Sequence, residues 1–279
     1  MSATTIASIH IYPVKSLGGF SVPHVQLTDR GLAHDRRWML VDEAGRFLSQ
    51  REVPAMACLH CGPNGTGFTV TDVRHGSSVD LPWTLDVGTR IGARVWEDEV
   101  DLLLGTGPMH QWFSEALHRP LRLAYMPEST VRPTDPKYAE ARVALSDAFP
   151  ALVISRASLD DLNARLETPV PMERFRPNFV LSGGRPYQED DWKEFTLGTV
   201  NFKNVKPCAR CVIPNTDQQT GVRSAEPLRT LASYRSMGNK VLFGMNAIFD
   251  AGGSVREGDV VMIGRSDDQM ISVPPELAW

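Results

Sequence analysis

The sequence lacks the features that mark several large classes of protein. No apolar run approaches the roughly 18 residues that a membrane-spanning helix needs. The first eight residues contain no basic residue and no long apolar stretch, so no signal peptide is predicted. The formal net charge is only −4, which gives no general attraction to nucleic acid or to a membrane surface. We therefore expect a cytoplasmic protein with neither nucleic acid nor a membrane as partner.

Cysteine is scarce, and four cysteines in a chain with no predicted leader indicate a reducing compartment. The seven histidines show no metal-ligand spacing. The cysteines form two C-x-x-C pairs, Cys58–Cys61 and Cys208–Cys211, so a four-thiolate zinc site is formally possible. The long gap between the pairs argues against zinc. The strand expected at the first pair also argues against it, because strand residues three apart face opposite sides. A thioredoxin-like redox function is supported even less than a zinc site, since the strand-to-helix context of that motif is missing.

What the sequence contains is mostly strand pattern. At 279 residues and 42% hydrophobic content, the chain can bury one large core or two small ones. Alternation and β-branched residues predict short strands in the first half, followed by one helix at 107–117 and a strand at 121–125. Prolines at 127, 133 and 136 then mark a junction. The strands expected in the first half span 5–14, 22–27, 38–41, 46–49, 68–71 and 93–96.

The second half repeats this pattern with two further helices. A capping-box-like spacing from Ser158 to Asp161 predicts that one helix opens there, and Pro227 starts the other. Strands are expected at 151–154, 179–181, 195–205 (as a hairpin), 240–249 and 255–263. The expected fold class is mainly β (α+β). We place an N-terminal β domain at 1–120, a β-barrel with a few peripheral helices at 121–267 and a tail at 268–279.

The most informative stretch is Lys206–Gly221, where Arg210 lies between Cys208 and Cys211. A thiolate beside a guanidinium has a lowered pKa and is ready to bind a metal or to act as a nucleophile. Asn-Thr-Asp and Thr-Gly follow, which is turn chemistry, so the thiols lie on or beside a loop. The alternative is that Cys208 and Cys211 are buried and pack as small hydrophobic side chains without a chemical role.

Basic residues are also unevenly spread. They gather at Arg30, His34, Arg36 and Arg37, again at Arg174 and Arg176, and at Arg210. Local basic clusters in a mildly acidic chain fit a small anionic ligand, although each arginine taken alone fits an ordinary surface position.

The 206–221 stretch resembles the molybdenum-binding loop of MOSC-domain proteins, in the branch that contains the mitochondrial amidoxime-reducing component and its bacterial relatives. Four other segments agree with that branch in the same order: 11–16, 31–38, 145–155 and 174–178. The resemblance implies an N-terminal MOSC-type β domain packed on a MOSC β-barrel, with molybdenum cofactor (Mo-molybdopterin) held at their junction. The resemblance also implies a role in detoxification, and the family has been associated with pyridoxal phosphate binding.

The resemblance also implies roles for single residues. Cys211 matches the thiolate that binds molybdenum, and Cys208 takes a packing or secondary role, with the reverse assignment left open. Asp147 is the second candidate catalytic residue, as a proton relay or as the holder of a backbone turn. Arg210 is expected to stabilise the Cys211 thiolate. The candidate cofactor-binding residues are Lys15, Ser16, Arg36, Arg176, Asn178, Ala209 and Arg210. Because these positions come from both ends of the chain, residues 1–36 must pack against the barrel and share its site.

The implied reaction is the two-electron reduction of small N-hydroxylated substrates such as amidoximes or hydroxylaminopurines. No plant-type ferredoxin cysteine spacing is present. The electrons are therefore expected from a separate ferredoxin- or cytochrome b5-like protein and its reductase. Two alternatives stay open: a sulfurtransferase that carries a persulfide on Cys211, and a non-catalytic protein that binds or delivers the cofactor.

Overall fold

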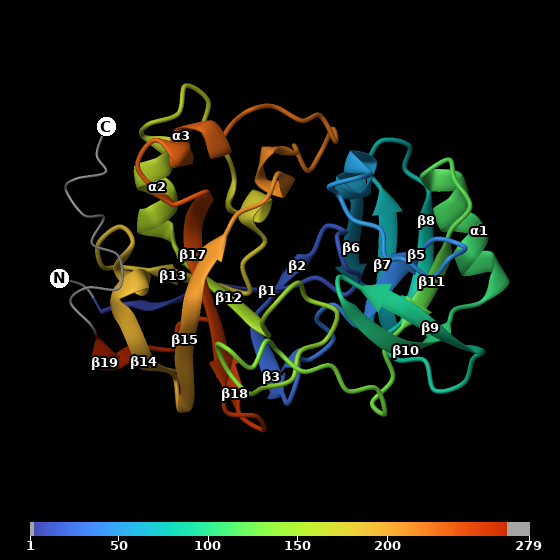
Figure 1. The fold of residues 1–279 in the computed structure, drawn as a ribbon, viewed down its shortest axis with the longest axis horizontal. Coiled ribbons are helices and arrows are strands. Elements are labelled where there is room, and N and C mark those ends of the chain that lie inside the picture. Colours follow the sequence, from blue (N-terminus) through green and yellow to red (C-terminus); the bar gives the residue numbers. More distant parts are fainter. Residues whose placement is uncertain (1–2, 267–279) are drawn as a thin grey trace.

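The computed structural model describes residues 3–266, so the predicted tail at 268–279 lies outside the described residues. The prediction of a mainly β fold is confirmed. Figure 1 shows two halves side by side, one built mostly from residues after 150 and the other from residues between about 38 and 125. An irregular segment joins them between β11 (Arg122–Tyr125) and β12 (Ala151–Ser155).

The first half contains two small antiparallel sheets and one helix. One sheet has the strand order β5-β11-β10-β9, and the other has the order β6-β7-β8. Helix α1 (Gly107–Ala116) packs beside β11, and its Phe113 is fully buried. The strands are β5 (Trp38–Val41), β6 (Leu59–Pro63), β7 (Gly67–Asp72), β8 (Ser78–Pro82), β9 (Arg90–Val95) and β10 (Asp98–Leu104).

A larger curled sheet dominates the second half. Its order is β19-β14-β15-β17-β12-β13-β1-β2, and β16 (Ser236–Met237) pairs with β17 beside this path. Helices α2 (Arg156–Asn163) and α3 (Leu228–Ala232) cover one end (Figure 1). The remaining strands are β13 (Phe179–Ser182), β14 (Trp192–Leu197), β15 (Val200–Ala209), β17 (Lys240–Phe249), β18 (Ser254–Arg256) and β19 (Val261–Ser266).

The first strands of the chain belong to this second sheet. β1 (Thr5–Ile11) pairs with β13, and β2 (Phe20–Val22) pairs with β1. β3 (His24–Thr28) lies between β4 (Gly31–Leu32) and β18. Ile6, Ile9 and Ile11 point into the core that Phe179, Phe195 and Phe202 also fill. The expected packing of the N-terminal segment against the second half is thus what the strand pairing shows. The boundary at residue 120 stays a prediction, since β11 pairs with β5 and β10.

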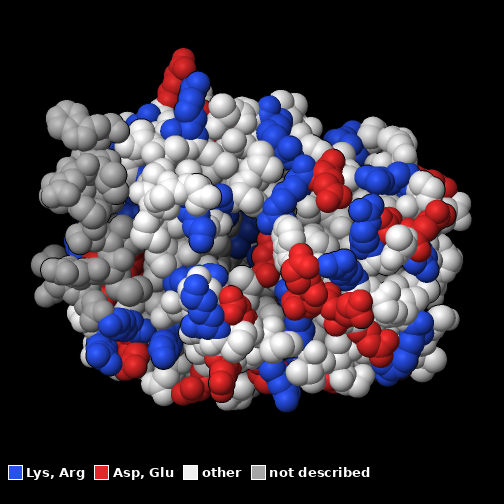
Figure 2. Space-filling model, in the orientation of Figure 1, with Lys and Arg blue, Asp and Glu red and all other residues white. Residues whose placement is uncertain are grey.

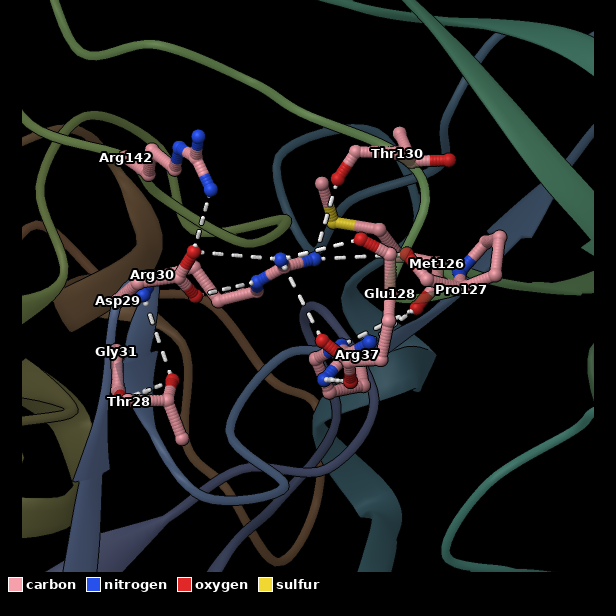
Figure 3. Close-up of polar contacts among 10 residues, drawn as sticks. All are labelled: Thr28, Asp29, Arg30, Gly31, Arg37, Met126, Pro127, Glu128, Thr130 and Arg142. Atoms are coloured by element: carbon pink, nitrogen blue, oxygen red, sulfur yellow. Dashed lines mark hydrogen bonds and ion pairs between the residues drawn. The ribbon is translucent and has the colours of Figure 1, made fainter. Parts of the chain in front are cut away.

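An arginine clasp ties the connecting segment to the N-terminal loop (Figure 3). Arg30 donates to the carbonyl oxygens of Thr130 at 3.1 Å and Glu128 at 3.2 Å. Arg37 donates to the Met126 carbonyl oxygen and pairs with the Glu128 carboxylate at 2.7 Å. Both arginines are buried. Both arginines therefore bind the chain's own carbonyl groups. Their clustering in the sequence suggests an anionic ligand, but the structure leaves neither of them available to one.

Three local differences from the predicted elements have simple causes. Pro23, which has no N–H to donate, separates β2 from β3 within the single strand expected at 22–27. Helix α2 begins at Arg156, because Ser155 is the N-cap and its Oγ accepts the Ser158 backbone N–H at 3.1 Å. Ser158 is therefore inside the helix. The strand expected at the first cysteine pair begins only at Leu59, because Cys58 is the last residue of a short 3₁₀ helix, Pro54–Cys58.

Candidate functional site

A cavity of about 410 Å³ lies where the two halves meet. Figure 2 shows Lys and Arg side chains inside the hollow between the halves. Every residue predicted from the sequence as part of the site lines this cavity: Lys15, Ser16, Arg36, Asp147, Arg176, Asn178, Ala209, Arg210 and Cys211. Cys208 lines it as well. The structure thus brings together positions that lie up to 196 residues apart, from Lys15 to Cys211. Their individual chemical roles stay predictions.

An irregularity in the pairing of β15 with β17 lies at the cysteines that line the cavity. The pairing register of β15 with β17 shifts between Pro207 and Ala209, opposite Gly244, whose φ is +79°. A Cβ at position 244 would lie 2.5 Å from an Ile154 side-chain atom, so only glycine fits there. Bulges re-aim side chains beside functional sites. Here the extra residue belongs to β17, so that Cys208 lies opposite Phe243 and Gly244. Strand β15 ends at Ala209, and Cys211 lies in the loop that follows.

Arg210 contacts Cys208 and not Cys211. Its Nη1 donates to the Cys208 Sγ at 3.1 Å, and its Nη2 donates to the Phe175 carbonyl oxygen at 2.8 Å. The sequence-based expectation that Arg210 stabilises the Cys211 thiolate does not match this geometry. The reason is the direction of the side chains, because residues two apart in extended backbone share a face and neighbours do not.

Arg51 reaches the cavity from the first half. Its Nη2 lies 2.7 Å from Asp147 Oδ2, and its guanidinium lies over the Trp96 ring at 4.5 Å. Burial opposes its charge, but Asp147 and then Cys211 outweigh burial and raise the pKa of Arg51. The loop after Cys211 holds this region in place, since Arg223 Nη2 donates to the Gln50 carbonyl oxygen at 2.6 Å. Arg51 is therefore the cation of the first half that faces Asp147 and Cys211.

Asp147 is the centre of the charged contacts. Lys15 Nζ lies 2.5 Å from its Oδ1, and Trp96 Nε1 donates to the same oxygen at 3.4 Å. Burial alone would raise the pKa of Asp147, but Lys15 and Arg51 hold it far below its ordinary value. Buried Arg132 fixes the loop from behind by donating to the carbonyl oxygens of Ala144 and Ser146. Asp147 is therefore an ionised acceptor at neutral pH.

Lys15 is the buried cation of this pair. Besides Asp147, its Nζ contacts the Leu145 carbonyl oxygen at 2.8 Å and lies over the Phe47 ring at 5.0 Å. Burial lowers the pKa of Lys15 to about 8, and the attraction of Asp147 only partly offsets that effect. Lys15 is therefore the cavity group able to exchange a proton near neutral pH.

The lowered pKa of Lys15 predicts a pH dependence of stability in cofactor-free protein. Unfolding restores the ordinary pKa of 10.5, so between about pH 8 and 10.5 the unfolded chain binds more protons than the folded one. The contribution of Lys15 to the free energy of unfolding should therefore rise with pH across this window. Thermal melts from pH 7 to 10.5 should show this rise, and Lys15→Met should lose it.

A direct readout is the Nζ-methyl NMR signal after reductive ¹³C-methylation, with exposed Lys240 as the reference resonance. Asp147→Asn should lower the midpoint of Lys15 further by removing its counter-charge. A Lys15 midpoint equal to that of Lys240 would show that the amine is not desolvated as its surroundings indicate.

Two guanidinium groups share one aromatic ring on the other side of the cavity. Arg36 and Arg176 lie 4.2 and 4.3 Å from the centroid of the buried Tyr12 ring. Arg36 is neutralised by Asp35 at 2.6 Å. Arg176 donates from Nη1 to the Leu17 carbonyl oxygen at 2.6 Å, and its buried Nη2 has no partner among the described residues. Burial, followed by repulsion from Arg36, lowers the pKa of Arg176 to about 10. Arg176 thus keeps a charge that the protein itself does not fully compensate.

Asn178 and Ser16 shape the cavity wall through the backbone. The Asn178 side chain donates to the His10 carbonyl oxygen at 3.1 Å and accepts the Leu152 N–H at 3.2 Å, so it ties β1 to β12. The Ser16 carbonyl oxygen accepts a hydrogen bond from Gln50 Nε2 at 2.8 Å. Both residues line the cavity, and their predicted contact with a cofactor stays a prediction.

Unusual backbone is concentrated at this cavity. Of the seven non-glycine residues with positive φ in the described part of the chain, four line it: Ser16, Arg36, Trp96 and Arg176. Such conformations cost on the order of 1–3 kcal/mol each and cluster at functional sites. The cavity is therefore where this fold stores local strain.

Sequence reasoning missed several lining residues, chiefly Arg51, Trp96 and Asn246. Lys206 belongs to the cysteine motif, which predicts no role for it, and its Nζ lies 3.8 Å from the centroid of the Tyr138 ring. Arg51 and Trp96 carry no recognisable motif, and only the contact between the halves brings them to the site. Of the early basic cluster, only Arg36 lines the cavity, since His34 packs on Trp83 at 4.5 Å.

The second cysteine pair is separate from the cavity. Cys58 and Cys61 are buried, and desolvation raises the pKa of both thiols, that of Cys61 to about 12. Within residues 3–266, no group of three or more His, Cys, Asp or Glu side chains is placed to hold a metal ion. The four thiols therefore do not form the group that the zinc alternative requires. In the same part of the chain, none of the helices has the length and apolar character needed to cross a bilayer.

Comparison with known proteins agrees with this organisation. Residues 3–120 match the MOSC N-terminal beta barrel domain, and residues 140–262 match the MOSC domain. Human mitochondrial amidoxime-reducing component 1 is 33% identical over 280 residues, which cover 93% of this chain and 82% of that protein. The rice molybdenum cofactor sulfurase is 35% identical over 271 residues, which cover 86% of this chain. The chain spans only 32% of that sulfurase.

Among solved structures, the YUAD protein of Bacillus subtilis aligns over 93% of this chain and 94% of its own, at 9% identity and a TM-score of 0.41. The two family matches together cover most of the chain, and the human relative aligns with 93% of this chain. The protein belongs to the MOSC-domain family, with a MOSC N-terminal beta barrel domain ahead of its MOSC domain.

Proposed function

We propose that this protein holds molybdenum cofactor in the cavity between its halves and reduces small N-hydroxylated compounds. The observation that carries the proposal is the meeting of two thiols with incompletely paired guanidinium groups in one cavity. Family membership supports a role related to the cofactor. The reductase activity is the part that we infer.

The residues present fit an anionic, sulfur-ligated group. Arg176 Nη2 and Arg210 Nε are buried polar atoms without partners in the described chain. Leaving such donors unpaired costs about 1–3 kcal/mol each, so an anion that accepts from them is favoured. Cys211 supplies the soft thiolate that suits molybdenum. Arg36, Arg176, Arg210 and Lys15 would hold the pterin and its phosphate, and Ser16, Asn178 and Ala209 would shape the wall.

When bound, the cofactor would supply two-electron redox chemistry at its metal. The chain's own residues would handle protons and orientation. Lys15, with its pKa lowered to about 8, would deliver a proton from Nζ. Asp147 would stay ionised and accept a hydrogen bond from the substrate's N–OH or N–H group. Arg51 would hold Asp147 in place from the opposite side.

The overall reaction balances as one N–O bond broken, two electrons and two protons taken up, and one water released. For an amidoxime the product is the amidine. The electrons would come from a separate ferredoxin- or cytochrome b5-like protein and its reductase, because the cysteines of this sequence lack iron–sulfur spacing. The cytoplasmic location stays a prediction from the sequence.

A second candidate is sulfur transfer through a persulfide on Cys211. It is favoured by the similarity to molybdenum cofactor sulfurases and by the accessible pair of cysteines in the cavity. A non-catalytic role in binding or delivering the cofactor uses the same cavity without turnover.

The test is to make the protein in a host that synthesises the cofactor, then to measure molybdenum per chain and turnover with reduced viologen. We expect about one molybdenum per chain and conversion of benzamidoxime to benzamidine. Full loading without turnover would favour delivery. Turnover of a sulfur donor with a trapped Cys211 persulfide and no molybdenum would favour sulfur transfer.

A further inference from the structure

Trp96 occupies a position that ordinary sequences give to asparagine or glycine. It is the first of the two residues, Trp96 and Glu97, that connect β9 to β10, where Val95 pairs with Asp98. Its φ is +57°. Two-residue hairpin turns with positive φ strongly prefer Asn, Asp or Gly, and a bulky residue there is an outlier. The fold thus keeps a tryptophan where tryptophan is unfavourable.

The indole ring is fixed by three contacts. The Arg51 guanidinium lies 4.5 Å from its centroid, the Phe47 ring packs steeply tilted against it with the two centroids 5.0 Å apart, and its Nε1 donates to Asp147 Oδ1 at 3.4 Å. The residue nevertheless remains 41% exposed and lines the cavity. A large apolar ring that is held rigidly and still open to the cavity has surface left to offer a ligand.

This ring lies beside the polar group that the reaction needs. Because Trp96 Nε1 and Asp147 Oδ1 are in contact, a flat molecule resting on the indole has its edge within reach of Asp147. Phe149, two residues further along the same loop, also lines the cavity, and Lys206 Nζ lies 5.2 Å from its ring centroid. The cavity therefore combines aromatic surface with the charged groups already described.

We propose that Trp96 is the substrate-recognition platform of this site, on which planar aromatic N-hydroxylated compounds stack with their N–OH group toward Asp147. This inference rests on the proposed reductase function and goes further by naming the residue that would select planar aromatic substrates. Stacking needs a flat ring, so it favours aryl amidoximes and N-hydroxylated nucleobases over small aliphatic amidoximes. A tryptophan that only stabilises the hairpin would give no preference for aromatic over aliphatic substrates.

The experiment compares benzamidoxime with acetamidoxime, which carries the same reacting group without a ring. The specificity ratio is kcat/KM for benzamidoxime divided by kcat/KM for acetamidoxime. In cofactor-loaded protein, Trp96→Ala should lower this ratio by about tenfold, because the KM for benzamidoxime rises. Trp96→Phe should recover most of the ratio. Trp112→Ala is the matched control, since Trp112 is a half-buried tryptophan on α1 that does not line the cavity.

Binding separates this inference from the proposed function. Calorimetry with benzamidine, a flat product-like probe, should give a Kd about tenfold weaker for Trp96→Ala than for the unaltered protein, whether or not turnover occurs. No turnover but a weakened Kd would refute the reductase and keep the platform. An unchanged substrate ratio together with an unchanged Kd would overturn the platform. An equal loss for both substrates with a lowered melting temperature would also overturn it and assign Trp96 to the hairpin's stability.

Discussion

Cys211→Ser should lose the metal, whereas Cys208→Ala should keep it. The structure separates the two thiols by their surroundings. Cys208 Sγ is already engaged by Arg210, which is itself anchored on the Phe175 carbonyl oxygen. Cys211 lies in the loop after β15, on the side of Arg51. Cys208 is thus held by a guanidinium from its own loop, whereas Cys211 faces the cation that reaches the cavity from the first half, and we expect Cys211 to bind the metal.

The expected size of this effect follows from metal sites in general. Loss of an outer partner of a ligand already costs about 10–100-fold in metal affinity or activity, so loss of the ligand itself should cost at least as much. Molybdenum per chain should fall to background in Cys211→Ser, and turnover with viologen should fall with it. Cys208→Ala should retain the metal and part of the activity.

X-ray absorption at the molybdenum edge is the decisive measurement. The unaltered protein should show a third sulfur besides the two dithiolene sulfurs, and Cys208→Ala should still show it. Near-ultraviolet circular dichroism of both variants controls for folding. If Cys208→Ala loses the third sulfur and Cys211→Ser keeps it, the two assignments must be exchanged.

Arg176→Ala should weaken cofactor retention by about one to two decades, more than any other cationic substitution in the cavity. A hydrogen bond to a charged group contributes on the order of 1.5–3 kcal/mol, and Arg176 has a buried Nη2 ready to make one. Arg36→Ala should have a smaller effect, because Asp35 already compensates its charge. Arg176→Lys should not restore retention, since an ammonium group cannot reproduce the two-pronged guanidinium geometry.

Cofactor occupancy after dialysis, measured with the melting temperature of the cofactor-free protein, tests this ranking. Arg265→Ala on exposed β19 is the matched control and should keep full occupancy. The melting temperature of cofactor-free Arg176→Ala should change little, because the lost bond to the Leu17 carbonyl oxygen is offset by relief of repulsion with Arg36. Full occupancy in Arg176→Ala would show that the anion lies elsewhere in the cavity.

The sequence alone was sufficient for much of the strand pattern. Strand β5 and strand β17 were predicted at their observed bounds, and the β14–β15 hairpin was expected around Leu197. These elements follow from local alternation and turn residues, which need no knowledge of the rest of the chain. Helix α2 starts three residues before the predicted position, because both Ser155 and Ser158 can cap a helix and only the structure shows that Ser155 does so.

The candidate site divides in the same way. Cys211, Arg176 and Lys15 were predicted from ordered motifs, and the cavity gathers all of them. The long-range partners were decided only by tertiary structure: Arg210 donates to the Phe175 carbonyl oxygen, and Arg30 and Arg37 donate to backbone carbonyl groups of the connecting segment. Arg51 and Trp96 arrive from the opposite half without any motif. Sequence determines local propensity and residue chemistry, whereas the long-range partners of a side chain depend on how the two halves of the fold pack.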